Sequence, residues 1–301
     1  MTAFPLVRCA GAPRDLGLDQ GAAARVAIRA ALRGQLARNP LLAWRAGAAA
    51  RRAWRDLGRF FPHHAERMQG ISLGARVPEA ALVRELAALL TGDAGLAIAL
   101  ASEGAPGALL ARSTLRHACV LRASAPDNDY RSLELAPAVS AAAWIGVNEH
   151  GLAATATALP AAAASLAGCA APAQLLVQDV LQRFDSVEKA VDWALRRPAG
   201  GHASLLLADA SGRVGAVEIE GRTRRLLGAG ESALVGLAPA PAAAALGKAL
   251  AERRALGADA LANAVAEAAG APLVALADPA GRRLGLAHAG APLEWHALEP
   301  R

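Results

Sequence analysis

GVNEHGLA occupies residues 146–153, where two short apolar runs flank a polar turn. Asn148 and Gly151 are residue types that tight turns favour, because they adopt turn conformations at low cost. The stretch therefore predicts a strand, a tight turn and a returning strand.

Further short apolar runs, separated by turn signals, surround this hairpin and are typical of strands. They are residues 96–101, 108–112, 118–122, 138–147 and 152–158. Two helices are predicted at residues 172–184 and 186–196, and Asp185 and Ser186 are expected to cap the second.

The C-terminal part predicts two more hairpins and a helical region. Residues 203–208 and 213–219 flank the turn DASG at 209–212, and a further strand is expected at 223–227. Residues 241–269 are expected to be helical, and residues 273–277 and 283–287 form the last hairpin.

The first third of the chain has helical spacing of apolar residues. Helices are expected at residues 15–38 and 41–61, in the run that leads to Gly70, and at 78–90. Because helices and strands fall in separate runs, the sequence predicts an α+β fold.

Several motifs resemble those of the N-terminal-nucleophile (Ntn) hydrolases, in the order that this superfamily shows. The resemblance is specifically to the branch of isopenicillin-N acyltransferase and related linear-amide hydrolases, the C45 peptidase type. The motifs are GVNEHGLA at 146–153, GAPRDLG at 11–17 with Gly21, GISLG at 70–74, the helix pair at 172–197, ADASG at 208–212 and the closing strands at 271–298. The resemblance implies a four-layer αββα sandwich, with residues 1–94 as a helical propeptide-like segment and 95–301 as the core.

The resemblance also implies a chemistry. In this family a cysteine becomes the new N-terminus by self-cleavage, its thiolate attacks an amide or thioester carbonyl, and its own amino group is the base. The matching nucleophile position here is Leu96, or Ala97 if the alignment shifts by one residue. The aspartate that orients the amino group is matched by Leu115, and the oxyanion-hole asparagine by Gly236 or Leu237.

Three functional polar positions are thus apolar or glycine. We therefore expect a degenerate member, a pseudoenzyme that binds a small acyl or amide ligand or acts as a partner subunit. The alternative is an active amidase or acyltransferase with a relocated nucleophile, at Thr91, Ser102 or Cys119. Cysteine is among the most buried residue types, so Cys119 is interpreted as a core residue.

The expected substrate-pocket residues are Arg112, Asn148, Glu149 and His150, because this turn lies close to the pocket in the family. Turn formation alone also explains Asn148. For Arg112, a structural ion pair and a contact with a ligand carboxylate both remain open.

No cofactor and no metal site are expected. His63 and His64 are adjacent, and neighbouring residues of a helix point to different sides. The three cysteines, Cys9, Cys119 and Cys169, lie far apart without a CxxC pair, which excludes a disulfide framework and a thiolate zinc site.

The chain of 301 residues has a net charge of +6, and arginine supplies nearly all of its positive charge. This bias is typical of a GC-rich, bacterial genome. The densest run, Arg45, Arg51, Arg52, Arg55 and Arg59, is interpreted as a solvated helix face. Nucleic-acid binding is the second alternative, although aromatic stacking platforms are absent. No secretory signal or membrane span is recognised, so we expect a cytoplasmic protein that forms a homo-oligomer or a monomer.

Overall fold

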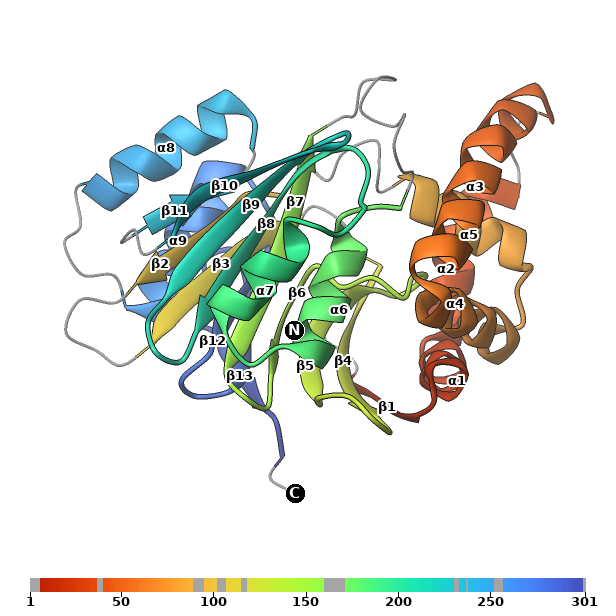
Figure 1. Cartoon of the computed structure of the whole chain (residues 1–301), viewed down its shortest axis with the longest axis horizontal. Helices are drawn as coiled ribbons and strands as arrows, with labels where there is room; N and C mark the ends of the chain where they lie inside the picture. Colours follow the sequence, from red (N-terminus) through yellow and green to blue (C-terminus); the bar gives the residue numbers. More distant parts are fainter. Residues whose placement is uncertain are drawn as a thin grey trace.

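The computed structural model describes residues 6–36, 40–88, 95–101, 107–114, 118–159, 171–229, 233–236, 238–251 and 257–299. Within these ranges two β-sheets lie face to face (Figure 1). Sheet A has the strand order β1 (Leu6–Gly11), β4 (Cys119–Pro126), β5 (Ser132–Pro137), β6 (Ile145–Asn148), β7 (Leu152–Leu159), β8 (His202–Asp209), β9 (Val214–Glu220) and β10 (Thr223–Ala229). Sheet B has the order β11 (Ala233–Val235), β2 (Ala97–Ala101), β3 (Ala108–Thr114), β12 (Leu273–Asp278), β13 (Arg283–His288) and β14 (Glu294–Ala297). The described pairs are antiparallel except β1 with β4.

Helices cover the outer face of each sheet. Sheet A carries α1 (Pro13–Ala23), α2 (Arg25–Leu36), α3 (Pro40–Phe60), α4 (Pro62–Ala75), α5 (Glu79–Ala88), α6 (Gln174–Arg183) and α7 (Val187–Ala194). Sheet B carries α8 (Ala240–Ala251) and α9 (Ala258–Ala269). Figure 1 shows α1 to α5 gathered beside β1 and β4, on the opposite side of the molecule from α8. The architecture is the predicted αββα sandwich.

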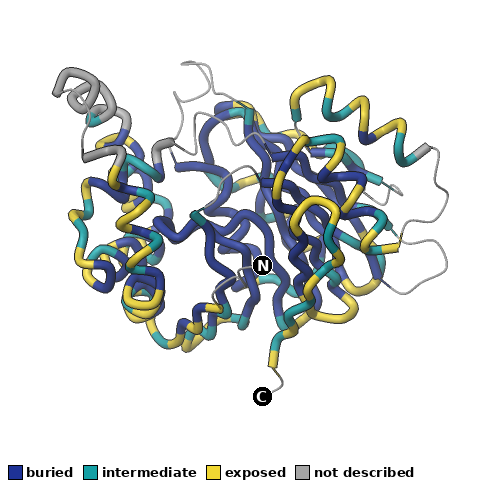
Figure 2. The backbone as a smooth tube through the Cα atoms, turned by 180° about the vertical axis from the view of Figure 1, so that it is seen from behind, coloured by how far each residue is buried: buried dark blue, intermediate teal, exposed yellow. Residues whose placement is uncertain are grey.

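Strand β8 shows how the sequence builds the layers. Successive side chains of a strand point to opposite faces. Leu205 and Leu207 pack with the helices on the outer face of sheet A, whereas Leu206 and Ala208 pack between the sheets. Figure 2 shows the buried strands between helices with exposed outer faces. Alanine and leucine thus fill the core, in place of the aromatic residues that make up only 3% of the chain.

Helices α1 and α4 approach so closely that only glycine fits between them. A Cβ atom added at Gly17 would lie 2.0 Å from the carbonyl oxygen of Arg67, and one added at Gly70 would lie 2.1 Å from that of Arg14. Gly21 and Gly74 continue the same seam. The two glycine motifs that resembled the family therefore form one helix–helix contact.

A buried polar network joins the N-terminal segment to sheet A. Arg122 of β4 donates to Glu134 of β5 and, over 2.8 Å, to Oε1 of Gln20 in α1. Gln178 of α6 donates to Glu134 over 2.9 Å. Together with the parallel strand β1, these bonds tie residues 6–88 to the core. The division of the chain at residue 94 into a propeptide-like segment and a core remains a prediction.

One predicted strand is shorter in the structure, because buried side chains bond to its main-chain carbonyls. The predicted strand at 138–147 is a strand only from Ile145, because carbonyl groups of residues 138–142 accept hydrogen bonds from the buried side chains of Gln20 and Arg122. Strands β1, β5, β11 and β14 were not predicted. The predicted helix at 15–38 is two helices, α1 and α2, and the helical region at 241–269 is α8 and α9. The other predicted helices and strands are present, with shifted ends.

The predicted cap of α7 is also wrong. Ser186 occupies the N-cap position without a side-chain hydrogen bond to the helix. Instead, Asp209, from the turn between β8 and β9, accepts a 3.1 Å hydrogen bond from the backbone N–H of Val187. Among the described helices, none is both long enough and apolar enough to cross a membrane.

Candidate functional site

The position of the expected nucleophile lies at the start of β2. The backbone N–H of Leu96 donates to Oγ of Ser113 over 2.8 Å, and its carbonyl accepts from the Ser113 N–H over 2.8 Å. The Leu96 side chain packs outward, with α8 and α9. Ala97, the next residue, packs between the sheets. The side chain that faces the inter-sheet space is therefore the methyl group of Ala97 and not that of Leu96.

Arg112 lies beside Ala97, its partner in the β2–β3 register. Its guanidinium is buried and donates from Nη1 to the carbonyl of Ala156 in β7, so it bridges the two sheets. A Cβ atom at Gly95 would lie 3.1 Å from Nη2 of Arg112. The structure thus gives Arg112 a main-chain acceptor, where an ion pair or a ligand carboxylate had been the alternatives.

A side chain at Gly236, one of the two positions matched to the family's asparagine, would require neighbouring side chains to shift. A Cβ atom at this position would lie 2.8 Å from Oγ1 of Thr157 and 3.0 Å from Oγ of Ser204. These two hydroxyl groups are buried and lie 3.0 Å apart. The neighbouring Gly236 N–H donates to the Ala97 carbonyl over 2.9 Å. Hydroxyl groups and backbone therefore occupy the space beside Ala97.

The other expected pocket residues lie at one end of β7, away from Arg112. Asn148, Glu149 and His150 form the turn before Leu152, whereas Arg112 bonds to Ala156, four residues further along β7. A strand rise of ~3.3 Å per residue separates the two places by roughly 13 Å. The structure does not bring Arg112 together with this turn.

Each residue of the turn has a structural contact. Asn148 is buried, donates to main-chain carbonyls of residues 181 and 184, and accepts from the N–H groups of residues 150 and 152. Glu149 forms a salt bridge with Arg131 at 2.8 Å. The His150 ring lies 4.1 Å from the ring of Tyr130. These contacts account for the polar residues of the turn without a ligand.

The proposed substitute nucleophiles divide into two groups. Thr91 and Ser102 lie outside the described residues, as do Leu115, Leu237 and Cys169. Cys119 is 6% exposed, and burial raises the pKa of its thiol to about 11. Burial also raises the pKa of Cys9. Both described cysteines are therefore thiols at neutral pH, and the thiol form is a poor nucleophile.

Sequence reasoning missed a cluster of His63, His64 and Asp179. His63 Nε2 lies 2.6 Å from Oδ1 of Asp179, and His64 Nε2 lies 3.1 Å from the same oxygen. The expectation that the two histidines face apart is wrong, because their ring centroids are 4.2 Å apart. Asp179 is on α6, more than a hundred residues away in sequence, so no local pattern could have joined it to them.

The cluster holds a charged carboxylate beside a neutral ring. Burial lowers the pKa of His64 to about 4, and His63 and Arg67 add to this effect. Burial alone would raise the pKa of Asp179, but the contacts with His64 and His63 outweigh it and hold the pKa below its usual range.

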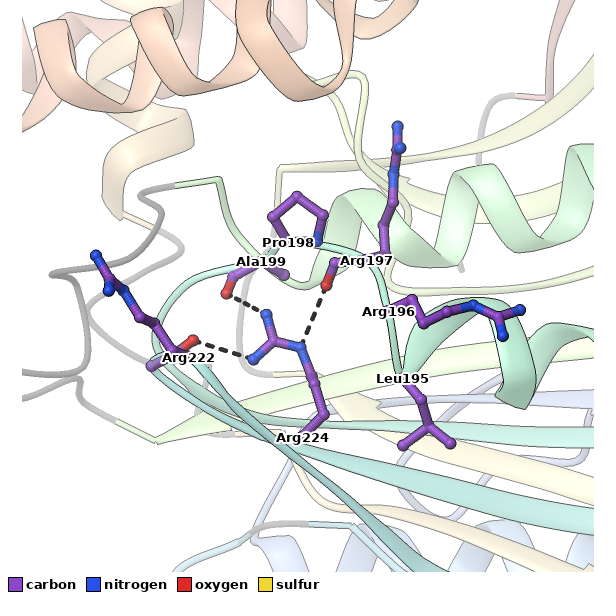
Figure 3. A pocket seen from close by; sticks show the side chains of 8 residues that line it. Leu195, Arg196, Arg197, Pro198, Ala199, Arg222 and Arg224 are labelled. Carbon is purple, nitrogen blue, oxygen red and sulfur yellow. Dashed lines mark hydrogen bonds between the residues drawn. The ribbon is translucent and has the colours of Figure 1, made fainter.

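Four arginines line a surface pocket of about 330 Å³ between the end of α7 and β10. Figure 3 shows that the side chains of Arg196, Arg197 and Arg222 point away from one another. Only Arg224 points inward, and it donates to the carbonyls of Arg197, Ala199 and Gly221. The guanidinium groups therefore do not converge on a place for an anion.

The arginines of α3 lie on its solvent side. Arg51, Arg52, Arg55 and Arg59 are exposed, and Ala53 and Leu57 of the same helix are buried. The side chain of Arg45 lies outside the described residues. The described part of the run is a solvated helix face, as interpreted from the sequence.

Comparisons with known proteins identify the fold. A scan against protein-family models and a search of curated proteins find no match. An N-acylethanolamine-hydrolyzing acid amidase ortholog from Caenorhabditis elegans is similar in structure, with a TM-score of 0.50 and 12% identity over 62% of this chain and 93% of that chain. Penicillin V acylase from Agrobacterium tumefaciens has a TM-score of 0.47 and 16% identity, over 67% of this chain and 86% of that chain. A mutant of conjugated bile acid hydrolase from Clostridium perfringens has a TM-score of 0.46 and 12% identity, over 68% of this chain and 92% of that chain. The chain has the fold of the Ntn-hydrolase superfamily.

Proposed function

We propose that this chain, which has the Ntn-hydrolase fold, is a C45-type protein that binds a small acyl or amide ligand without cysteine-nucleophile catalysis. The observation that carries the proposal is that neither residue matched to the nucleophile, Leu96 or Ala97, has a nucleophilic group, and that the methyl group of Ala97 faces the inter-sheet space beside the buried Arg112. Without a nucleophile no acyl-enzyme forms, whatever the rest of the site provides.

The surroundings of Ala97 support this proposal. An oxyanion-hole donor is worth roughly 3–4 kcal/mol of transition-state stabilisation. Neither residue matched to that donor, Gly236 or Leu237, has a side chain that can donate a hydrogen bond, and a Cβ atom at Gly236 would require Thr157 and Ser204 to shift. Beside Ala97 lie two buried hydroxyl groups, which bond to each other, and the guanidinium of Arg112, which donates to the Ala156 carbonyl. We propose these polar groups as the contacts of a carbonyl or amide group.

Strand pairing supports the absence of self-processing. If Leu96 were the new N-terminus, its backbone nitrogen would become the amino group, and this N–H is held by the Ser113 hydroxyl group just before β2. The upstream segment contributes β1 to sheet A and Gln20 to the buried network. Release of that segment would expose both.

The first experiment is the intact mass of freshly purified protein, with a hydrolysis assay on N-acyl glycines of different chain length. We expect a single species near 30.5 kDa and no hydrolysis. Two fragments would contradict the proposal and would identify the residue that became the new N-terminus. Hydrolysis that disappears on substitution of Thr91 or Ser102 would establish the relocated-nucleophile alternative instead.

Ligand binding is tested by the melting temperature in the presence of N-hexanoylglycine. A ligand that binds only the folded state raises this temperature. The matched variant is Thr157→Val, which keeps the shape of the side chain and removes the hydroxyl group beside Gly236. We expect a rise for the natural chain and a smaller rise for the variant. Equal behaviour of the two proteins would refute binding at this place.

A further inference from the structure

The cluster of His63, His64 and Asp179 has the composition of a metal site. Two imidazole nitrogens and one carboxylate suit borderline divalent ions such as Zn²⁺. The three ligand atoms lie within 4.8 Å of one another. Around an ion with bonds of ~2.1 Å, neighbouring ligand atoms are about 3.0–3.5 Å apart. The 3.1 Å distance from His64 to Asp179 Oδ1 lies in this range, whereas His63 is hydrogen-bonded to the same oxygen at 2.6 Å and would move apart by about 0.4 Å or more.

Two buried atoms of the cluster form no hydrogen bond with the residues that the structure describes. They are Oδ2 of Asp179 and Nε2 of His64, and the second of these faces Oδ1 of Asp179 at 3.1 Å. Asp179 is 0% exposed and His64 is 1% exposed. A buried carboxylate oxygen or ring nitrogen without a partner is costly, and a bound cation would satisfy both atoms.

A pocket of about 210 Å³ opens beside the two histidines. Asp127 and Asp129 line it and are exposed, while Arg67 lines its buried side. Counted with Asp179, the carboxylates outnumber the Arg67 guanidinium, so the local charge favours a divalent cation. The pocket also gives an ion access from solvent and room for water in the remaining coordination positions.

We propose that His63, His64 and Asp179 bind a divalent transition-metal ion, with Zn²⁺ as the typical case. Each imidazole would coordinate through the lone pair of Nε2 and carry its proton on Nδ1. The ion would join the first turn of α4 to the middle of α6, and its open side would face the pocket. This inference goes beyond the proposed function and does not depend on it.

The test is titration of chelator-treated full-length protein with Co²⁺, followed by visible absorption, and with Zn²⁺, followed by calorimetry. We expect a single ion per chain and a Co²⁺ spectrum that shows nitrogen ligands. The variants are His63→Ala, whose side chain is 22% exposed, and Asp179→Asn, which keeps the shape of the side chain. Loss of a residue that only orients a metal ligand already lowers metal affinity 10–100-fold. Because His63 and Asp179 would be ligands themselves, we expect the metal affinity of either variant to fall at least ~100-fold.

The control variant is His202→Ala, because His202 also faces a carboxylate, Glu218 at 3.4 Å, but has no second histidine there. Its affinity should equal that of the natural chain. Circular dichroism shows whether each variant is folded. If Asp179→Asn does not fold, the metal affinity of His63→Ala tests the proposal. Absence of binding in the natural chain would overturn the proposal. So would equal affinity of the natural chain and a folded His63→Ala variant, which would indicate an adventitious ion only.

Discussion

The contact of α1 with α4 predicts that one added methyl group destabilises the protein. In Gly17→Ala the new Cβ would lie 2.0 Å from the carbonyl oxygen of Arg67, and also 2.9 Å from the backbone N of Ile71. These are backbone atoms, which cannot rotate away as a side chain does. The two helices must separate by about 1.4 Å to restore an ordinary contact of 3.4 Å.

The expected magnitude follows from two opposing effects. Overpacking of a tight core costs about 1–3 kcal/mol, and a backbone clash belongs at the upper end of that range. Replacing glycine by alanine inside a helix returns about 1 kcal/mol through helix propensity. The net loss of unfolding free energy for Gly17→Ala is therefore about 2 kcal/mol. Thermal denaturation should show a fall in melting temperature on the order of 5 °C.

Gly58→Ala is the matched control, because Gly58 lies inside α3 and a Cβ there would meet nothing within 4 Å. The same substitution should stabilise the protein at this position by up to about 1 kcal/mol. The two variants should thus differ by about 3 kcal/mol and in opposite directions. If Gly17→Ala melted at or above the temperature of Gly58→Ala, the close approach of α1 and α4 would be refuted.

Three further predictions concern a cap, a buried acid and the thiols. Asp209→Ala should cost about 1–2 kcal/mol of unfolding free energy through the lost cap of α7, whereas Ser186→Ala should change little; urea denaturation of both variants checks this. Burial alone would raise the pKa of Glu134, but the nearby guanidinium groups and hydrogen bonds hold it below 4.5, so its stabilising contribution is lost as the pH falls below about 4.5. Glu134→Gln leaves a buried guanidinium unpaired and should cost about 3–5 kcal/mol at pH 7, and its melting temperature should approach that of the natural chain in acid. In a Cys169→Ser background, iodoacetamide should not modify Cys119 or the other remaining cysteine until the protein is unfolded, and mass spectrometry of the native protein checks this.

Local pattern predicted the parts of the fold in which side chains alternate without buried charge. Strands β7 and β8 follow apolar runs, and the turn after β8 has Gly212 at φ 89°, as its sequence predicts. Strand β5 was missed because Glu134 lies in its middle, and a charged residue there argues for a loop. Only the fold shows that Arg122, on the neighbouring strand, pairs with it.

The contacts of the candidate site residues also become visible only in the fold. The turn at 148–150 was expected near a pocket because it lies close to the pocket in the family, and its polar groups bond to the backbone and to Arg131. The pair of His63 and His64 was dismissed because neighbouring side chains of a helix point to different sides. These two residues are in the first turn of α4, where both rings turn toward Asp179 on another helix. Such clusters depend on tertiary contacts and leave no mark on local sequence.

The residues around the start of β2 contact one another, so a substitution at one position affects the others. Thr157 and Ser204 are hydrogen-bonded partners on β7 and β8, and they fit only because residue 236 is glycine. The Gly236 N–H in turn donates to the carbonyl of Ala97, which fixes the backbone over the place of the missing nucleophile. Restoring a cysteine at Ala97 alone would therefore supply a thiol without an oxyanion donor, and restoring an asparagine at 236 alone would break the contact of the two hydroxyl groups. Under the proposed function, a return to the family's chemistry would therefore require changes at both positions.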